Sequence, residues 1–322
     1  MNDPLIDLAT VQPIPIHGAL PGARASVRRI AASLLTVHDE KLDSDWRWRA
    51  TDTDDVELRY GFYAIHEQLE RAAGAIAVGR AGTAEDDIGL AGDVPLGPAV
   101  PALGAMTAAR WDLHGVLTPL PDEVLDADPG GGEWTVRQTL GHILGSQLSY
   151  GWFNAWFLSR PVPVGEAVYP DEGDLPPEPT EEELAKGTLA EIRDRFDGIA
   201  DACATAVADL SPATLDLGAR WSGLPVSIGF RLGRYGSHIR EHTVQVDKTL
   251  GLLRREPSET ERLVRLVLAT YGRLEAQVIG RPAGDLDRSL AGGPSAIVLL
   301  TEAVAEAEAT AASVRRSSAT VG

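Results

Sequence analysis

Cysteine is almost missing from this sequence, since Cys203 is the only one among 322 residues. A single cysteine excludes an internal disulfide and a zinc site built from several cysteines. Its alanine-rich surroundings favour a small buried thiol over a nucleophile. Long apolar runs are also missing, so no segment is predicted to span a bilayer. The first residues lack the basic-then-apolar pattern of a signal peptide, and we therefore expect a cytoplasmic protein.

Basic residues are scarce relative to acidic ones: 29 Lys and Arg stand against 47 Asp and Glu, which gives a formal net charge of −18. Nucleic acids and anionic membrane surfaces attract proteins through basic patches, so this balance argues against both partners. Hydrophobic residues make up 44% of the chain and charged residues 24%. That composition is ordinary for a soluble globular protein with a sizeable core.

Helical periodicity runs through most of the chain, and no convincing strand pattern is present. We therefore predict an all-α protein. Asp55 is a candidate N-cap for the second helix, and Thr180 with Glu183 forms a capping pattern at the start of a later one. The helices are predicted at 24–37, from 56 onward, and at 102–117, 134–158, 180–210, 230–250, 259–279 and 295–313.

A glycine-, proline- and acid-rich segment at 80–101 predicts a domain boundary. We divide the chain into an N-terminal helical region, 1–92, and a helical bundle with C-terminal helices, 93–322. The acidic turns 39–45 and 122–128 are similar, and each follows a helix and precedes a helix that bears a histidine. The N-terminal region could thus be a degenerate half-bundle repeat, although acidic turns also recur by chance.

The segment 159–179 is a long connection rich in proline and acidic residues. Antiparallel helices that are neighbours need only a short loop, whereas parallel neighbours need a crossover. The length of this segment therefore favours a crossover.

Three histidines are candidate metal ligands. His238 and His242 lie four residues apart in a predicted helix, which places them one turn apart on the same face. Two imidazoles so placed can bind one cation, although such pairs also occur on solvated helix surfaces. His142 lies in a narrow polar seam of an otherwise apolar helix, where a buried polar group needs a partner. His66, in an aromatic helix, is interpreted as a core or interface histidine.

Three neutral imidazoles that leave one position open are typical of a catalytic divalent metal site. The sequences WTVRQTLGH at 134–142 and HIREHTVQ at 238–245 resemble the DinB/YfiT-like superfamily. Its members include the metal-binding domain of mycothiol-dependent maleylpyruvate isomerase and related thiol S-transferases. The similarity covers about residues 95–255. The extra N-terminal region and C-terminal helices depart from the family, so a family substrate is not carried over.

The resemblance implies a four-helix bundle with a long crossover between its second and third helices, which the segment 159–179 fits. It implies that zinc or nickel is held by His142, His238 and His242, with water or a cofactor thiolate completing the shell. It also implies a homodimer.

If the site is catalytic, the resemblance implies an enzyme in which a low-molecular-weight thiol, mycothiol or a relative, attacks an electrophile in S-transfer or isomerisation. Arg234 could receive a carboxylate of substrate or cofactor, or could form a surface salt bridge. Glu241 could orient a ligand histidine or face solvent. Gln138 and Gln245 are candidates for binding the cofactor.

Two other interpretations remain open at this point. The chain could be a non-enzymatic metal-containing bundle, for instance a stress-associated binding or dimerisation module, in which the metal is mainly structural. Alternatively, the histidines could bind no metal. Metal content separates the last interpretation from the others, and a thiol-transfer assay separates the enzyme from the module.

Overall fold

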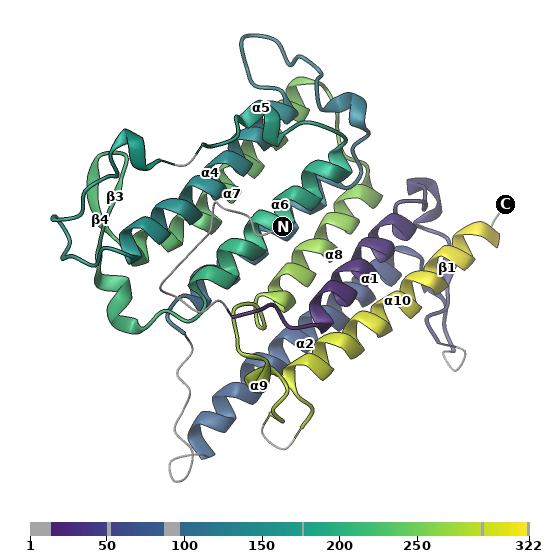
Figure 1. Cartoon of the computed structure of the whole chain (residues 1–322). Coiled ribbons are helices and arrows are strands. Elements are labelled where there is room, and N and C mark those ends of the chain that lie inside the picture. Colours follow the sequence, from purple (N-terminus) through teal and green to yellow (C-terminus); the bar gives the residue numbers. More distant parts are fainter. Residues whose placement is uncertain (1–13, 50–52, 87–96, 176, 291–292, 321–322) are drawn as a thin grey trace.

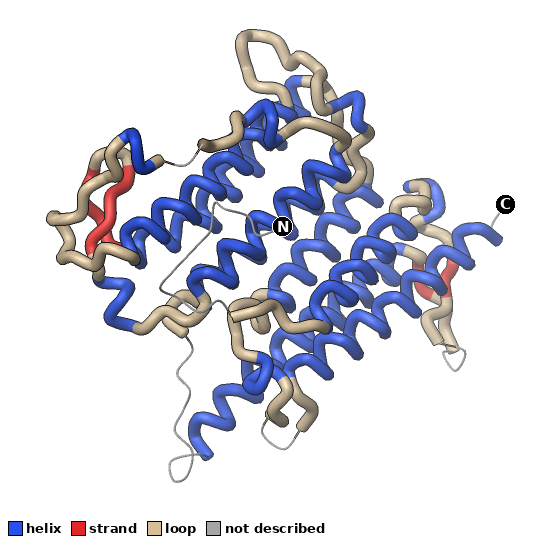
Figure 2. The backbone as a smooth tube through the Cα atoms, viewed as in Figure 1, coloured by secondary structure: helices blue, strands red, loops and turns tan. Residues whose placement is uncertain are grey.

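Long helices dominate the structure, a computed structural model that describes residues 14–49, 53–86, 97–175, 177–290 and 293–320 (Figure 1). They form packed rods connected by loops, as the tube view shows (Figure 2). The predicted all-α class is therefore confirmed. No helix in the described ranges is long and apolar enough to cross a membrane.

The predicted four-helix bundle is present, and we call it the inner bundle. It consists of α3 (Val100–Leu117), α4 (Val136–Leu158), α6 (Leu189–Val207) and α7 (Ile228–Leu252). Both α3 and α4 pack against α7, and α4 also packs against α6. The predicted long crossover joins α4 to α6 and contains η4 (Glu172–Asp174) and α5 (Glu181–Leu184).

The remaining long helices pack on one another and form a second group, which we call the outer bundle. It consists of α1 (Ala19–Leu34), α2 (Arg59–Asp86), α8 (Glu259–Glu275) and α10 (Ala296–Thr320). Because α10 contacts both α1 and α2, the N-terminal and C-terminal helices share a core. The packing of α3 against α8 joins the two bundles. Shorter helices connect the rods: η2 (Asp39–Lys41), η3 (Asp122–Val124), η5 (Pro212–Asp216) and α9 (Ala283–Leu286).

The two acidic turns that are similar in sequence make similar contacts. After η2, the backbone N–H of Arg59 donates to the carbonyl oxygen of Leu42 at 3.0 Å. After η3, the backbone N–H of Arg137 donates to the carbonyl oxygen of Leu125 at 2.9 Å. These matched contacts favour the half-bundle repeat, which stays a prediction. The boundary at residue 92 lies outside the described residues, so the division into 1–92 and 93–322 also stays a prediction.

The helix predicted at 180–210 is interrupted. The Thr180–Glu183 capping box forms as predicted, but α5 ends after one turn. Gly187 then adopts a φ of +104°, which L side chains rarely adopt. Thr188 starts α6 with a second capping box to Glu191. The continuous-helix prediction is wrong because two strong local start signals lie within one apolar pattern.

Two small antiparallel sheets form, although the sequence shows no strand pattern. In the first, β1 (Asp45–Trp46) pairs with β2 (Val56–Glu57), and in the second β3 (Gly218–Trp221) pairs with β4 (Leu224–Ser227). Strands of this length are too short to show a period-two pattern. Asp55 does not cap α2, because β2 intervenes and the Asp55 carboxylate pairs with Arg47 at 2.8 Å. The predicted cap is therefore wrong.

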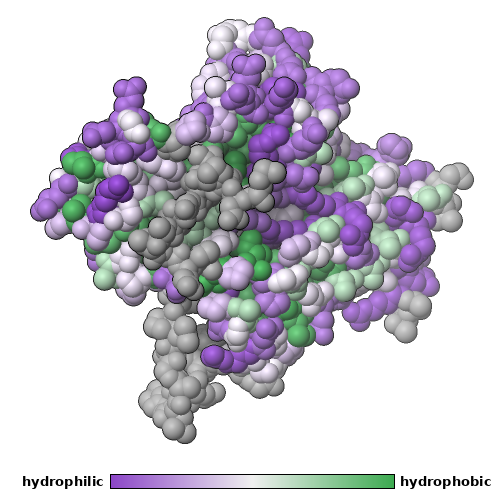
Figure 3. Space-filling view, in the orientation of Figure 1, coloured by the Kyte–Doolittle hydropathy of each residue, from purple (hydrophilic) through white to green (hydrophobic). Residues whose placement is uncertain are grey.

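The surface and the interior differ in hydropathy. On the face drawn in Figure 3, hydrophilic residues predominate and hydrophobic residues show as scattered patches. The buried apolar side chains of both bundles instead form one continuous cluster. Burial of that cluster is the main source of stability for the helices.

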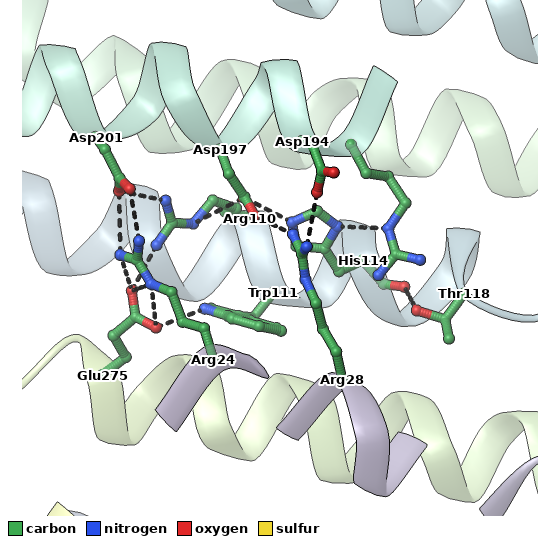
Figure 4. Close-up of polar contacts among 11 residues, drawn as sticks. Arg24, Arg28, Arg110, Trp111, His114, Thr118, Asp194, Asp197, Asp201 and Glu275 are labelled. Carbon is green, nitrogen blue, oxygen red and sulfur yellow. Dashed lines mark hydrogen bonds and ion pairs between the residues drawn. The ribbon is translucent and has the colours of Figure 1, made fainter. Parts of the chain in front are cut away.

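A buried charge network lies where the two bundles meet (Figure 4). Glu275 of α8 is fully buried and accepts hydrogen bonds from Arg24 of α1, Arg110 of α3 and the indole of Trp111. Asp201 of α6 accepts from the same two guanidinium groups. Burial raises the pKa of Glu275, but the arginines outweigh it and hold the pKa below its usual value. The network thus balances charge where unpaired ions would be very costly.

His114 of α3 is fully buried beside this network. Its Nε2–H donates to Asp197 at 2.8 Å, and its Nδ1 accepts from Nε of Arg193 at 3.0 Å. Burial lowers the pKa of His114 from 6.5 to about 4, although Asp197 opposes this shift. The ring is therefore neutral in the folded protein at neutral pH.

Acidification is expected to destabilise the fold through His114. Between pH 6.5 and about 4 the unfolded chain binds a proton there that the folded protein does not. The contribution is on the order of 3 kcal/mol, fully present above the unfolded pKa and lost as pH falls toward the folded one. In His114→Gln the amide keeps a donor and an acceptor without titrating, so this contribution should disappear. Urea unfolding across this pH range measures it, and identical pH slopes in the two proteins would contradict it.

Candidate metal centre

Two helices of the inner bundle carry the three candidate ligands. The N-cap of α4 is Thr135, whose side chain forms a capping box with Gln138. The N-cap of α7 is Ser227, whose side chain accepts from the backbone N–H of Phe230. These caps fix where each helix starts, and the packing of α4 against α7 sets which faces meet.

The structure brings the imidazoles of His142, His238 and His242 together. The ring centroid of His142 lies 5.2 Å from that of His238 and 4.6 Å from that of His242. The two rings on α7 lie 4.3 Å apart. One nitrogen from each ring lies within 4.8 Å of the others, so the three could hold one metal ion.

Hydrogen bonds to Nδ1 of His142 and of His242 determine which nitrogen of each ring can bind a metal. Nδ1 of His142 lies 2.8 Å from a carboxylate oxygen of Glu181, and Nδ1 of His242 lies 2.7 Å from the amide oxygen of Gln245. Because these oxygens accept, each Nδ1 carries the proton and each Nε2 keeps its lone pair. Nε2 of His242 lies 3.0 Å from Nε2 of His238. Two nitrogens on one tetrahedral zinc lie roughly 3.3 Å apart, so this spacing fits.

The environment keeps the α7 rings uncharged. Burial lowers the pKa of His238 to about 3, and the neighbouring imidazoles of His242 and His142 add to the effect. Burial also lowers the pKa of His242. Neutral imidazole is the form that binds metals, and a set of three imidazoles suits zinc, nickel and similar divalent ions. The residues present therefore fit a divalent cation.

The two candidate catalytic residues pair with each other. Nη1 and Nη2 of Arg234 donate to the two carboxylate oxygens of Glu241 at 2.8 and 2.9 Å. This pairing matches the salt-bridge interpretation of Arg234. The Glu241 side chain is about half exposed. The proposed catalytic roles of both residues stay predictions.

The two glutamines occupy different positions. Gln138 accepts from the backbone N–H of Thr135 at 2.9 Å as part of the α4 cap. Gln245 instead accepts from Nδ1 of His242 and so helps to orient a candidate ligand. Their roles in binding a cofactor stay predictions.

His66 and Cys203, which the sequence predicted to be structural residues, occupy structural positions. Nδ1 of His66 lies 2.7 Å from the hydroxyl of Thr270 on α8, which confirms it as an interface histidine. Cys203 is buried, and burial raises the pKa of its thiol to about 12. Such a thiol is inert at neutral pH, as its alanine-rich surroundings predicted.

Glu181 is not among the predicted site residues, yet it contacts His142 directly. It is the first residue of α5 and lies 39 positions after His142 in the sequence. The only local signal was the cap at Thr180, which predicts a helix start but not what that helix covers. A crossover of this length leaves the docking position of its far end open.

A surface cavity of about 480 Å³ is lined by two residues that contact His142, namely Trp134 and Glu181. Trp134, Gln138, Glu181 and Glu182 contribute to its lining. The Trp134 ring also makes an edge contact with His142, with centroids 5.2 Å apart. The cavity therefore lies on the side of His142 that faces Trp134 and Glu181.

Helical bundles can hold a divalent metal between side chains of facing helices. The three converging histidines on α4 and α7 place this chain in the class of bundles that could do so. The family model described as the DinB superfamily matches residues 105–246, a range that begins in α3, ends in α7 and includes all three histidines. Residues 105–246 are therefore similar to the DinB superfamily, as the sequence motif predicted. Searches of curated proteins and of solved structures found no match.

Proposed function

We propose that the inner bundle binds one divalent ion, zinc or nickel, at His142, His238 and His242, and that it activates a low-molecular-weight thiol such as mycothiol. The thiol would be used for S-transfer to, or isomerisation of, an electrophilic small molecule. One observation carries this proposal. The Nδ1 atoms of His142 and His242 donate hydrogen bonds to Glu181 and Gln245, so both Nε2 lone pairs can serve as ligands within the three-histidine cluster. The DinB-superfamily match over the same residues supports it.

His142, His238 and His242 would hold the divalent ion, which would supply Lewis acidity and so lower the pKa of a bound thiol or water. The residues of the chain do the positioning. Glu181 and Gln245 each hold one ring in a single tautomer, and burial keeps His238 neutral. In S-transfer to a chlorinated aromatic compound, the carbon–sulfur bond forms, chloride leaves and the thiol proton passes to solvent.

The test compares turnover in metal-loaded wild type and in the double variant His238→Ala/His242→Ala. Glutathione, bacillithiol and mycothiol are each offered with a chlorinated aromatic compound or an epoxide. His66→Ala is the matched control, because His66 lies in the outer bundle and hydrogen-bonds Thr270 there. We expect turnover with at least one thiol, retained in His66→Ala and reduced more than about 100-fold in the double variant.

Equal turnover in the wild type and the double variant would contradict the proposal. Metal binding without turnover for any thiol would also contradict it, and would instead favour the non-enzymatic metal-containing module.

A further inference from the structure

We propose that Glu181 is the positioning residue of the metal centre: its carboxylate holds His142 in the Nδ1–H tautomer and makes Nε2 a stronger ligand. This inference rests on the proposed function, since it concerns the same three histidines. It adds a role for the crossover, which would place a charged partner behind a ligand carried by another helix.

The contact has the geometry of an orienting partner. The Glu181 oxygen lies 2.8 Å from Nδ1 of His142, and this ring nitrogen is not the one left free for a metal. The His142 side chain is 28% exposed and the Glu181 side chain 53%, so the pair lies at the edge of the bundle. Histidines that bind metals commonly donate their other N–H to a carboxylate, which fixes the ring and raises its basicity.

The position of Glu181 is set by close packing of α5 on α4. A Cβ atom at Gly141 would lie 2.5 Å from the carbonyl oxygen of Glu181, and one at Gly145 would lie 3.3 Å from its Cγ. Only glycine at 141 allows this approach. Arg137 of α4 also donates to the carbonyl oxygen of Ala185 at 2.6 Å, immediately after α5. These contacts hold the backbone of α5 against α4 next to His142.

The imidazole rings of His142 and His242 differ in the charge of the group that accepts a hydrogen bond from the ring. Within the described ranges, Glu181 is the only carboxylate that forms a hydrogen bond with one of the three histidines. His242 bonds the neutral Gln245, and the charge of Glu241 is compensated by Arg234. Hydrogen bonds to an ionised group are roughly twice as strong as neutral ones. His142 is therefore the ring whose tautomer is fixed most firmly.

The test uses two readouts on the full-length protein. The first is nitrogen NMR of His142 in metal-free protein, which reports the tautomer without any metal. The second is affinity for Zn²⁺ against a chromophoric chelator, together with the visible spectrum of the Co²⁺-loaded protein. The variants are Glu181→Ala, Glu181→Gln and the matched control Glu182→Ala, which removes an adjacent exposed carboxylate from the same helix.

We expect Glu181→Ala to bind Zn²⁺ about 10- to 100-fold more weakly than wild type, as loss of an outer partner typically does. Glu181→Gln should be intermediate, because its amide oxygen still accepts but carries no charge. Glu182→Ala should match wild type. The Nδ1–H tautomer of His142 should dominate in wild type and become mixed with the other tautomer in Glu181→Ala. The Co²⁺ spectrum should shift while one ion per chain remains bound.

Gly141→Ala provides a second route to the same result, because it displaces the backbone of Glu181 and leaves the carboxylate in the chain. It should weaken Zn²⁺ binding in the same direction. Wild-type affinity and an unchanged tautomer in Glu181→Ala would overturn the inference while leaving the proposed function in place. Loss of a Co²⁺ ligand in Glu181→Ala would overturn it as well, by making Glu181 a ligand. A wild-type protein that binds no ion would overturn the proposed function. The tautomer of His142 is measured without metal, so it still shows in that case whether Glu181 positions the ring.

Discussion

Replacing His142 with alanine is expected to reduce the divalent metal content from close to one ion per chain to less than about one tenth of that value. His142 supplies one of three imidazole nitrogens, and it is the only one of them on α4. Removal of an outer partner costs about 10- to 100-fold in metal affinity, and loss of a ligand should cost more. Elemental analysis of protein purified and dialysed in parallel measures the difference.

The control for this prediction is His66→Ala, which removes a half-buried histidine that hydrogen-bonds Thr270 and is not one of the three clustered histidines. It should retain wild-type metal content. Circular dichroism should show that both variants are folded, since the His142 side chain is partly exposed. Equal metal content in wild type and His142→Ala would remove His142 from the site.

Replacing Glu275 with alanine is expected to lower the free energy of unfolding by about 3–5 kcal/mol, the typical cost of breaking a buried ion pair. The carboxylate is fully buried and receives hydrogen bonds from Arg24, Arg110 and Trp111. Its removal leaves Asp201 as the remaining partner shared by two largely buried guanidinium groups. Because these residues come from both bundles, the loss should loosen the junction between them.

Chemical denaturation followed by circular dichroism measures this effect. Glu308→Ala is the matched control, because it removes a carboxylate from an exposed pair with Arg29 at 3.1 Å. Exposed pairs of this kind contribute about 0–1 kcal/mol. A loss for Glu275→Ala no larger than that for Glu308→Ala would show that the network does not stabilise the fold.

The sequence could predict those parts of the fold that depend on local residue patterns. Apolar periodicity predicted the long helices, and the capping signal at Thr180 marks a helix start in the structure. The length of the crossover predicted its topology. The break at Gly187 was not predicted, because glycine near a helix end has several uses and only the φ value reveals which applies.

The site could be predicted only in part. The spacing of His238 and His242 placed them on one face of a helix, and the polar seam around His142 made it the third candidate, which the family resemblance then supported. Glu181 could not be identified, because its contact depends on how the end of a long crossover docks against α4. The charge network was missed for a related reason, since Arg24 and Glu275 lie 251 positions apart and only tertiary packing brings them together.

X-ray absorption spectroscopy of the zinc-loaded wild-type protein tests the metal centre most directly. Three imidazole nitrogens at about 2.0–2.1 Å with one further light atom are expected, and one imidazole fewer in any zinc retained by His142→Ala. A zinc shell with one imidazole or none in the wild type would contradict a centre built from His142, His238 and His242.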